Sequence, residues 1–201
     1  MSDLLTFIHL GLRHITDLEA FDHILFLLAL AAIYRGRDWR DLLWVVTAFT
    51  VGHSVTLALA VTGALHLPTS VIEFLIPLTI LATGLENVVV SRREQAPLGG
   101  RYRPVFAAVF GLVHGAGFAN YLRSLFVGSI AVPLLGFNVG IELGQLIVLA
   151  LAGLVLGVLD RVLGALPHPA AIPSAHRLRV LAVSVPVVIV ATQMAVVRRP
   201  W

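Results

Sequence analysis

The sequence contains no cysteine and no lysine, only two methionines, and only 12% charged residues. Without cysteine the chain forms no disulfide and offers no thiolate to a metal, and two methionines argue against a thioether path for copper(I). All of its cationic side chains apart from histidine are therefore arginines. Because 58% of the residues are hydrophobic, almost nothing remains from which to build a soluble domain.

Six hydrophobic runs match the ~30 Å hydrocarbon core of a bilayer. They cover residues 19–34, 42–65, 71–90, 104–127, 132–159 and 178–197. Before them, Leu4 to His14 alternates apolar and polar residues at helical spacing. That segment is too short to cross, so we expect an interfacial or partly inserted helix there, with a frayed terminus as the alternative. The predicted fold is one all-α integral membrane domain over residues 1–201, with about six transmembrane helices.

The arginines predict an orientation. They lie in the connections after the first, third and fifth predicted crossings, whereas the loop after the second crossing has none. By the positive-inside rule those three connections are cytoplasmic and both termini are outside, with Arg198 and Arg199 as the exception. Arginines beside membrane spans indicate topology and anionic lipid before nucleic acid. No basic region precedes an apolar stretch at the N-terminus, so we expect no cleavable signal peptide.

One stretch, from Gly136 to Gln145, places polar groups inside an apolar run. Asn138, Glu142 and Gln145 are spaced i, i+4 and i+7, so on a helix they share one narrow face. A carboxylate near the centre of the bilayer costs on the order of 3 kcal/mol and persists only when something pairs with it. We therefore expect a partner for Glu142 on another crossing.

The other crossings also carry polar side chains, and the predicted orientation assigns each a depth. Asp22, His23 and Glu73 lie in the outer part with Asn138 slightly deeper, His53, His114 and Glu142 lie near the middle, and Glu86 and Asn87 approach the cytoplasmic side. Imidazoles with carboxylates are the ligands of borderline divalent ions such as nickel, cobalt and zinc. The same groups suit a proton relay. The sequence thus predicts a polar path across the membrane.

Each residue also has a structural interpretation. At the ends of crossings, the alternatives are that Asp22 is a helix N-cap, that Glu73 reaches the interfacial water, and that Glu86 and Asn87 cap a helix end. Within the crossings, the alternative is that polar side chains only form hydrogen-bonded contacts between helices. This applies to His53, His114, Asn138 and Gln145. Glu142 is the residue least easily explained in this way.

Four motifs together resemble those of the HupE/UreJ family of bacterial membrane proteins. They are His14 with Phe21-Asp-His-Ile-Leu-Phe-Leu-Leu28, Thr47-Ala-Phe-Thr-Val-Gly-His-Ser-Val-Thr-Leu57, Phe110-Gly-Leu-Val-His-Gly-Ala-Gly-Phe118 and Phe137-Asn-Val-Gly-Ile-Glu-Leu-Gly-Gln145. The resemblance spans roughly residues 9 to 155, in the family's order. The gap between His14 and Asp22, and a second motif with one histidine and no acid, resemble the less characterised second branch of the family.

The resemblance implies a permease of the bacterial inner membrane for nickel or cobalt. It implies metal ligands at His14, Asp22, His23, His53, His114 and Glu142. The polar path predicted from the orientation adds Glu73, Glu86, Asn87, Asn138 and Gln145. The family is associated with hydrogenase and urease maturation. Besides the metal ion and lipid, the resemblance therefore implies a metallochaperone or a metalloenzyme-maturation protein as a possible partner.

Four hypotheses follow. The first is a permease for a nickel-, cobalt- or zinc-class ion, driven by a gradient or a partner, since no Gly-x-x-x-x-Gly-Lys motif occurs. The second is an intramembrane metalloenzyme in which histidines hold zinc and a carboxylate activates water, or a metal sensor. The third is a haem-binding bundle with His53 and His114 as axial ligands. The fourth is a structural or partner-binding subunit.

Overall fold

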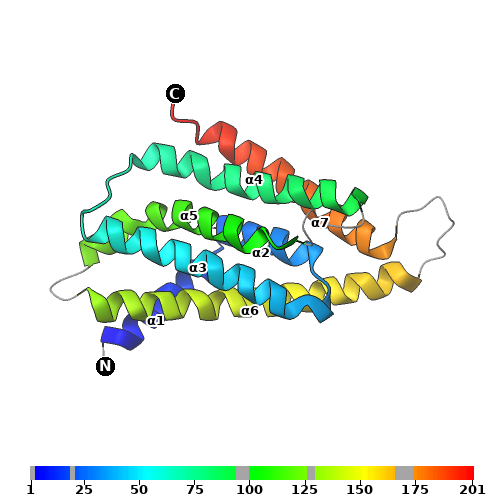
Figure 1. Cartoon of the computed structure of the whole chain (residues 1–201), viewed down its shortest axis with the longest axis horizontal. Helices are drawn as coiled ribbons and strands as arrows, with labels where there is room; N and C mark the ends of the chain where they lie inside the picture. The colour runs from blue at the N-terminus through cyan, green and yellow to red at the C-terminus, as the bar shows by residue number, and fades with distance from the viewer. Residues whose placement is uncertain (1–2, 19–20, 94–99, 126–129, 166–173) are drawn as a thin grey trace.

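Helix α6 is the longest element of the computed structural model, and the other helices lie along it in an elongated bundle (Figure 1). The structure describes residues 3–18, 21–93, 100–125, 130–165 and 174–201. Every regular element in these ranges is a helix, as the sequence predicts. The helices are α1 (Asp3–Thr16), α2 (Asp22–Ile33), the 3-10 helix η1 (Gly36–Asp38), α3 (Trp39–Val61), α4 (Thr69–Arg93), α5 (Arg103–Leu125), α6 (Ala131–Ala165) and α7 (Ala175–Val197).

Four helices, not six, are long and apolar enough to cross a membrane in the described part of the chain. They are Gly36–Val61, Thr69–Arg92, Ala131–Ala165 and Ala175–Val197. Within the predicted crossing 19–34 the described helix, Asp22–Ile33, has only 12 residues. At 1.5 Å per residue it is about 18 Å long, well short of the ~30 Å core. In the predicted crossing 104–127, the helix is present but its described apolar part is the shorter Arg103–Phe118.

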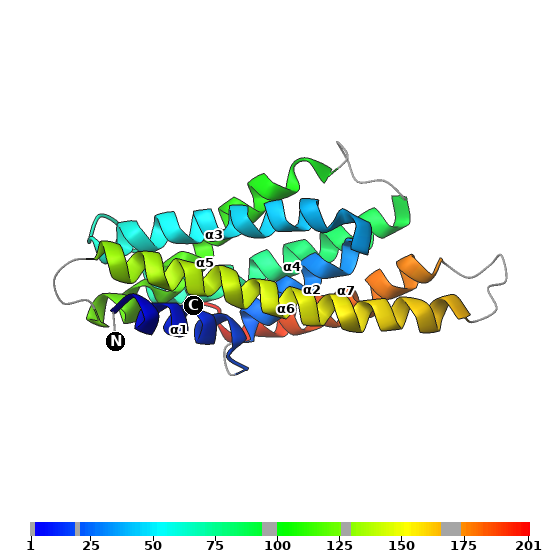
Figure 2. The same ribbon diagram turned by 90° about the horizontal axis from the view of Figure 1, so that it is seen from below.

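The N-terminal helices α1 and α2 follow one another along α6. α1 packs beside the first half of α6, where Gly136 and Gly140 face Leu4 and Ile8. The second half of α6 shares an apolar groove with α2 instead, and the two short helices lie end to end in Figures 1 and 2. With 14 and 12 residues, they are about 21 and 18 Å long, roughly two thirds of the ~30 Å core thickness. α1 therefore ends and α2 begins part-way along α6, and Asp17, Leu18 and Phe21 between them are exposed.

The helix ends fall into two groups along the long axis. Helices α2, α4 and α6 end, and α3, α5 and α7 begin, toward one end, on the right in Figure 1, whereas α1 begins and α7 ends toward the other. The first of these ends carries Arg35, Arg37 and Arg40, and with them Arg101, Arg103, Arg161, Arg177 and Arg179. We call it the arginine-rich end. Arg198 and Arg199 follow α7 at the opposite end.

The core between the helices is apolar and aromatic. Phe26, Phe49 and Phe137 are fully buried with Ile15 and Ile141. The outer faces of α3, α5 and α6 expose valine, leucine and isoleucine. Apolar side chains pointing outward are typical of helices whose surroundings are hydrocarbon rather than water.

Candidate metal centre

Glycines let α3 and α5 approach until their backbones touch. A Cβ on Gly52 would lie 2.0 Å from the carbonyl oxygen of Ala108, and one on Gly111 would lie 2.1 Å from that of Phe49. On Gly115 it would lie 2.3 Å from the carbonyl oxygen of His53. No residue larger than glycine fits without moving a backbone, so these three glycines fix the distance between the helices that carry His53 and His114.

Glycines also bring the backbones of α1 and α6 into contact. A Cβ on Gly11 would lie 2.1 Å from the carbonyl oxygen of Phe137, and one on Gly140 would lie 2.0 Å from that of Ile8. Because α1 is held backbone to backbone with α6, its last turn is placed against the bundle. That last turn contains His14.

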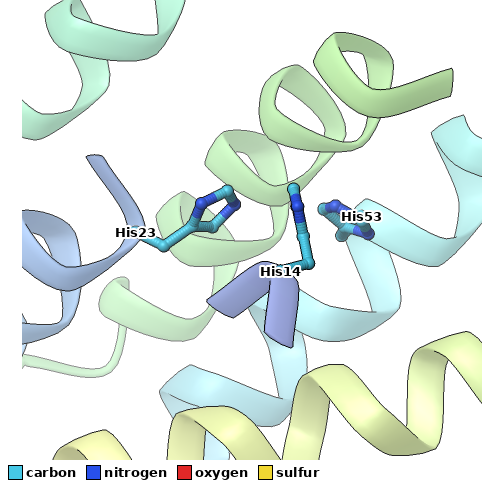
Figure 3. Close-up of side chains that lie close together, drawn as sticks. All are labelled: His14, His23 and His53. Atoms are coloured by element: carbon cyan, nitrogen blue, oxygen red, sulfur yellow. The ribbon is translucent and has the colours of Figure 1, made fainter. Parts of the chain in front are cut away.

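Three histidines from three helices meet at the α1–α2 break (Figure 3). His14 ends α1, His23 begins α2 and His53 lies in α3, and one ligand atom from each lies within 4.8 Å of the other two. Ring centroids are 4.6 Å apart for His14 and His23 and 6.3 Å apart for His14 and His53. Nitrogens bound to one ion at about 2.0–2.1 Å lie roughly 3.3 Å apart in a tetrahedral site, so small side-chain rotations bring these three onto one ion.

His114 of α5 adjoins this group. Its ring centroid is 5.5 Å from that of His23, and its Nδ1 lies 2.9 Å from the carbonyl oxygen of Phe110. A carbonyl only accepts, so Nδ1 carries the proton and donates it, and Nε2 keeps its lone pair. We call His14, His23, His53 and His114 the histidine cluster.

Most ring nitrogens of the histidine cluster are buried without a partner. His23, His53 and His114 are 6%, 0% and 2% exposed. The atoms without a hydrogen-bond partner among the described residues are His14 Nε2, both ring nitrogens of His23, both of His53, and His114 Nε2. Leaving a buried polar group unsatisfied costs about 1–3 kcal/mol, so a cluster of them indicates a site built for a ligand that accepts lone pairs.

Asp22 supplies the negative charge beside the cluster. One carboxylate oxygen, Oδ1, accepts a hydrogen bond from the backbone N–H of His23 and lies 3.2 Å from His23 Nδ1. That second contact lacks the alignment of a hydrogen bond. The other oxygen, Oδ2, lies 3.4 Å from Nη1 of Arg198, which follows α7. The N-cap position of α2 belongs to Phe21, so Asp22 is not the N-cap that the structural interpretation proposes.

Aromatic rings enclose the cluster. Phe118 and Phe137 are stacked, with centroids 5.1 Å apart, and the ring of Phe118 lies 4.0 Å from that of His14. On the other side, Phe49 and Phe26 lie 5.0 and 5.6 Å from His114. An apolar wall of this kind excludes water and strengthens electrostatic interactions inside it.

The polar face of α6 meets α3 instead of the histidines. Glu142 Oε1 accepts a 2.7 Å hydrogen bond from the Thr47 hydroxyl, and Gln145 Oε1 accepts one of 2.8 Å from Thr50. The expected partner of Glu142 is thus a threonine hydroxyl. Its second oxygen, Oε2, and the Oδ1 atom of Asn138 are buried without a partner among the described residues. Glu142 is not one of the ligand atoms that converge with His14, His23 and His53.

The remaining predicted path residues lie on α4 and outside the histidine cluster. Asn87, which is 1% exposed, donates from Nδ2 to the carbonyl oxygen of Ala29. Glu86 accepts hydrogen bonds from Arg103 and Tyr102 at the arginine-rich end. Glu73 is exposed near the start of α4 and forms no hydrogen bond or ion pair among the described residues.

Two arginines of this arrangement were not singled out by the sequence. Arg198 reaches Asp22, and Arg103 reaches Glu86. The sequence assigns both to loops, where they count only toward topology. A search for a cation to pair with each intramembrane carboxylate is the signal that could have found them.

Comparison with known proteins gives one match. The profile of the family described as "HupE / UreJ protein" matches residues 1–198, essentially the whole chain. Neither the curated proteins nor the solved structures contain a match to the chain.

Proposed function

The chain belongs to the HupE/UreJ family, whose members are bacterial membrane proteins linked to nickel and cobalt uptake, and from this premise we propose that it is a permease for a divalent transition-metal ion. The observation that carries the proposal is the histidine cluster. The ligand atoms of His14, His23 and His53 converge from three helices beside the carboxylate of Asp22, His114 adjoins them, and imidazole nitrogens are donors that nickel, cobalt and zinc prefer.

The cluster suits a transported ion better than a permanently held one. Its members lie on α1, α2, α3 and α5, so loading the site and opening it both follow from small shifts of these helices. Half-helices that meet inside a bundle are a recurring feature of transporters, because their free ends offer polar groups to an ion at membrane depth.

We propose that the ion enters at Asp22, His23 and His14 and passes to His53 and His114. Asp22 offers the charge that partly compensates a dication on leaving water. Arg198 lies against the same carboxylate, so an arriving ion displaces it. Beyond the cluster, Glu142 is the predicted ligand on α6. Glu73, Asn138, Gln145, Glu86 and Asn87 remain proposed path residues.

The orientation is also a proposal. Arginines gather at the end of the bundle where α2, α4 and α6 end and α3, α5 and α7 begin, which supports placing that end in the cytoplasm and both termini outside the inner membrane. A metallochaperone or metalloenzyme-maturation protein would then collect the ion at the arginine-rich end.

Uptake into proteoliposomes tests the function. We expect nickel, cobalt or zinc to accumulate with the parent protein and His14→Ala to reduce the initial rate at least ten-fold. The matched control is His9→Ala, because His9 is exposed on the same helix and has no place in the cluster. Equal loss in both variants, or no flux with the parent, would contradict the proposal. Tight metal binding without any flux would support the intramembrane metalloenzyme instead.

A further inference from the structure

A cavity of about 120 Å³ lies between α2, α4 and α5, toward the arginine-rich end. A cavity of this volume has room for several water molecules. At one end it is lined by Phe26 and Phe110, and these are residues that contact His114: the ring of Phe26 is 5.6 Å from it, and the carbonyl of Phe110 accepts its Nδ1–H. We call this space the inner cavity. Phe26 and Phe110 thus adjoin both the inner cavity and His114, although no histidine of the cluster lines the cavity.

The other end of the inner cavity is lined by Glu86, Tyr102 and Arg103. Arg103 begins α5, seven residues before Phe110, so the cavity extends about 10 Å along that helix. Among the described residues that line it, Glu86 is the one carboxylate and Arg103 the one guanidinium. Asn87 also lines it, and its buried Oδ1 has no partner among the described residues. A polar oxygen and a carboxylate here offer a second resting place for a hydrated dication.

A second cavity, of about 290 Å³, opens between the starts of α3 and α5. Its lining includes Asp41, Trp44 and Arg101, and it shares two residues with the inner cavity, Tyr34 and Arg103. Those two side chains therefore form the partition between the two spaces. The guanidinium of Arg103 lies 5.4 Å from the centre of the Tyr34 ring, as in a cation–π contact.

Arg103 is held firmly in this position. Its Nε and Nη2 donate to Glu86 Oε1 at 3.2 and 2.9 Å, and the Tyr102 hydroxyl donates to the same oxygen. Burial, together with the hydrogen bond to Glu86, raises the pKa of Tyr102 above its ordinary value, so its hydroxyl remains a donor at neutral pH. The side chains of Arg103 and Glu86 are 12% and 28% exposed. A positive charge thus lies between the inner cavity and the second cavity, at the arginine-rich end.

We propose that Arg103 is an inner gate: it occupies Glu86 while the path is empty, and it moves aside when a divalent cation enters the inner cavity and takes its place on the carboxylate. This inference rests on the proposed permease function and adds to it the residue that controls exit. A dication and a guanidinium compete for the same oxygen, so only one of them occupies Glu86 at a time.

Thiol labelling tests the gate, because the parent chain has no cysteine. Thr83→Cys places one thiol in the lining of the inner cavity. In proteoliposomes, a membrane-impermeant cationic methanethiosulfonate is applied from the arginine-rich end and the rate of modification is measured. We expect slow labelling with Arg103 present, at least ten-fold faster labelling with Arg103→Gln added, and faster labelling of the single-cysteine protein when cobalt is present.

Arg101→Gln is the matched control. Arg101 is exposed, lines the second cavity and does not line the inner one, so its loss removes the same charge near the reagent without opening the partition. Arg103→Lys keeps the cation and should label slowly, which separates gating from a loss of folding. Equal rates with and without Arg103→Gln, or an equal rise with Arg101→Gln, would overturn the gate. The labelling rates require no metal flux, so the gate and the permease proposal can fail separately.

Discussion

The contact between α3 and α5 gives the sharpest structural prediction. In Gly111→Ala, the new Cβ would lie 2.1 Å from the carbonyl oxygen of Phe49 and 2.9 Å from the amide nitrogen of His53. Real Cβ atoms essentially never approach closer than 3.0 Å, so the oxygen must retreat by about 0.9 Å. Both atoms belong to the backbone and cannot rotate away. The two helices must therefore separate near His53.

The expected cost follows from two opposing effects. Alanine in place of glycine favours a helix by about 1 kcal/mol. Overpacking a well-packed core costs typically about 1–3 kcal/mol, and here the obstacle is backbone, which places the cost at the upper end. We expect Gly111→Ala to lower the free energy of unfolding by about 1–2 kcal/mol. Because His53 moves with the backbone that retreats, we also expect cobalt affinity to fall about ten-fold, or ~1.4 kcal/mol.

Gly157→Ala is the control for this prediction. Nothing lies within 4 Å of a Cβ built on Gly157 in α6, so the helix propensity acts alone and stability should rise by up to about 1 kcal/mol. Thermal unfolding in detergent and cobalt titration calorimetry measure both effects. Equal stability and equal affinity in the two variants would refute the idea that glycine sets the helix distance at this site.

Three further predictions concern the cluster itself. His53→Leu should raise the stability of the metal-free protein by on the order of 1 kcal/mol, because it removes two buried nitrogens that have no partner among the described residues. Cobalt affinity should fall at least ten-fold. A loss of both stability and affinity would count against a ligand role. Arg198→Gln should increase cobalt affinity by about two- to five-fold, since a partly exposed ion pair at Asp22 competes with the metal, and unchanged affinity would remove that competition. Lowering the pH should weaken cobalt binding, because only neutral imidazole binds the ion. Burial disfavours the charged imidazole, so we expect a loss of roughly ten-fold between pH 7.5 and about 4 but only a small change between pH 7.5 and 5.5; equal affinity at pH 7.5 and 4 would contradict histidine ligation.

The all-helical character of the chain and its family could be predicted from the sequence, but the number of crossings could not. A hydrophobicity count does not register where a helix begins and ends. The sequence separates a short helix over Leu4 to His14 from the apolar run over 19–34, but the helix in that run, Asp22–Ile33, has only 12 residues and is the second of two short helices. Gly11 and Gly140 determine that the first one packs along α6, and that contact is a tertiary fact which hydropathy alone does not contain.

The residues of the site could also be predicted from the sequence only in part. Polar residues in apolar runs identified His14, His23, His53 and His114, because an intramembrane imidazole is unusual on its own. Which of them meet depends on helix rotation and on glycine contacts, and Glu142 accordingly pairs with a threonine of α3. The counter-ions were missed for a different reason. In the sequence, an arginine at a helix end indicates only which side of the membrane its loop occupies. Its carboxylate partner lies up to 176 residues away along the chain.

The most direct test of the central claim is X-ray absorption spectroscopy of the purified, cobalt-loaded protein, with nickel and zinc loaded in parallel. We predict a first shell that contains at least three imidazole nitrogens at about 2.0–2.1 Å, and one imidazole fewer in His53→Leu. A shell made only of oxygen, or a spectrum that His53→Leu leaves unchanged, would show that the histidine cluster does not bind the ion.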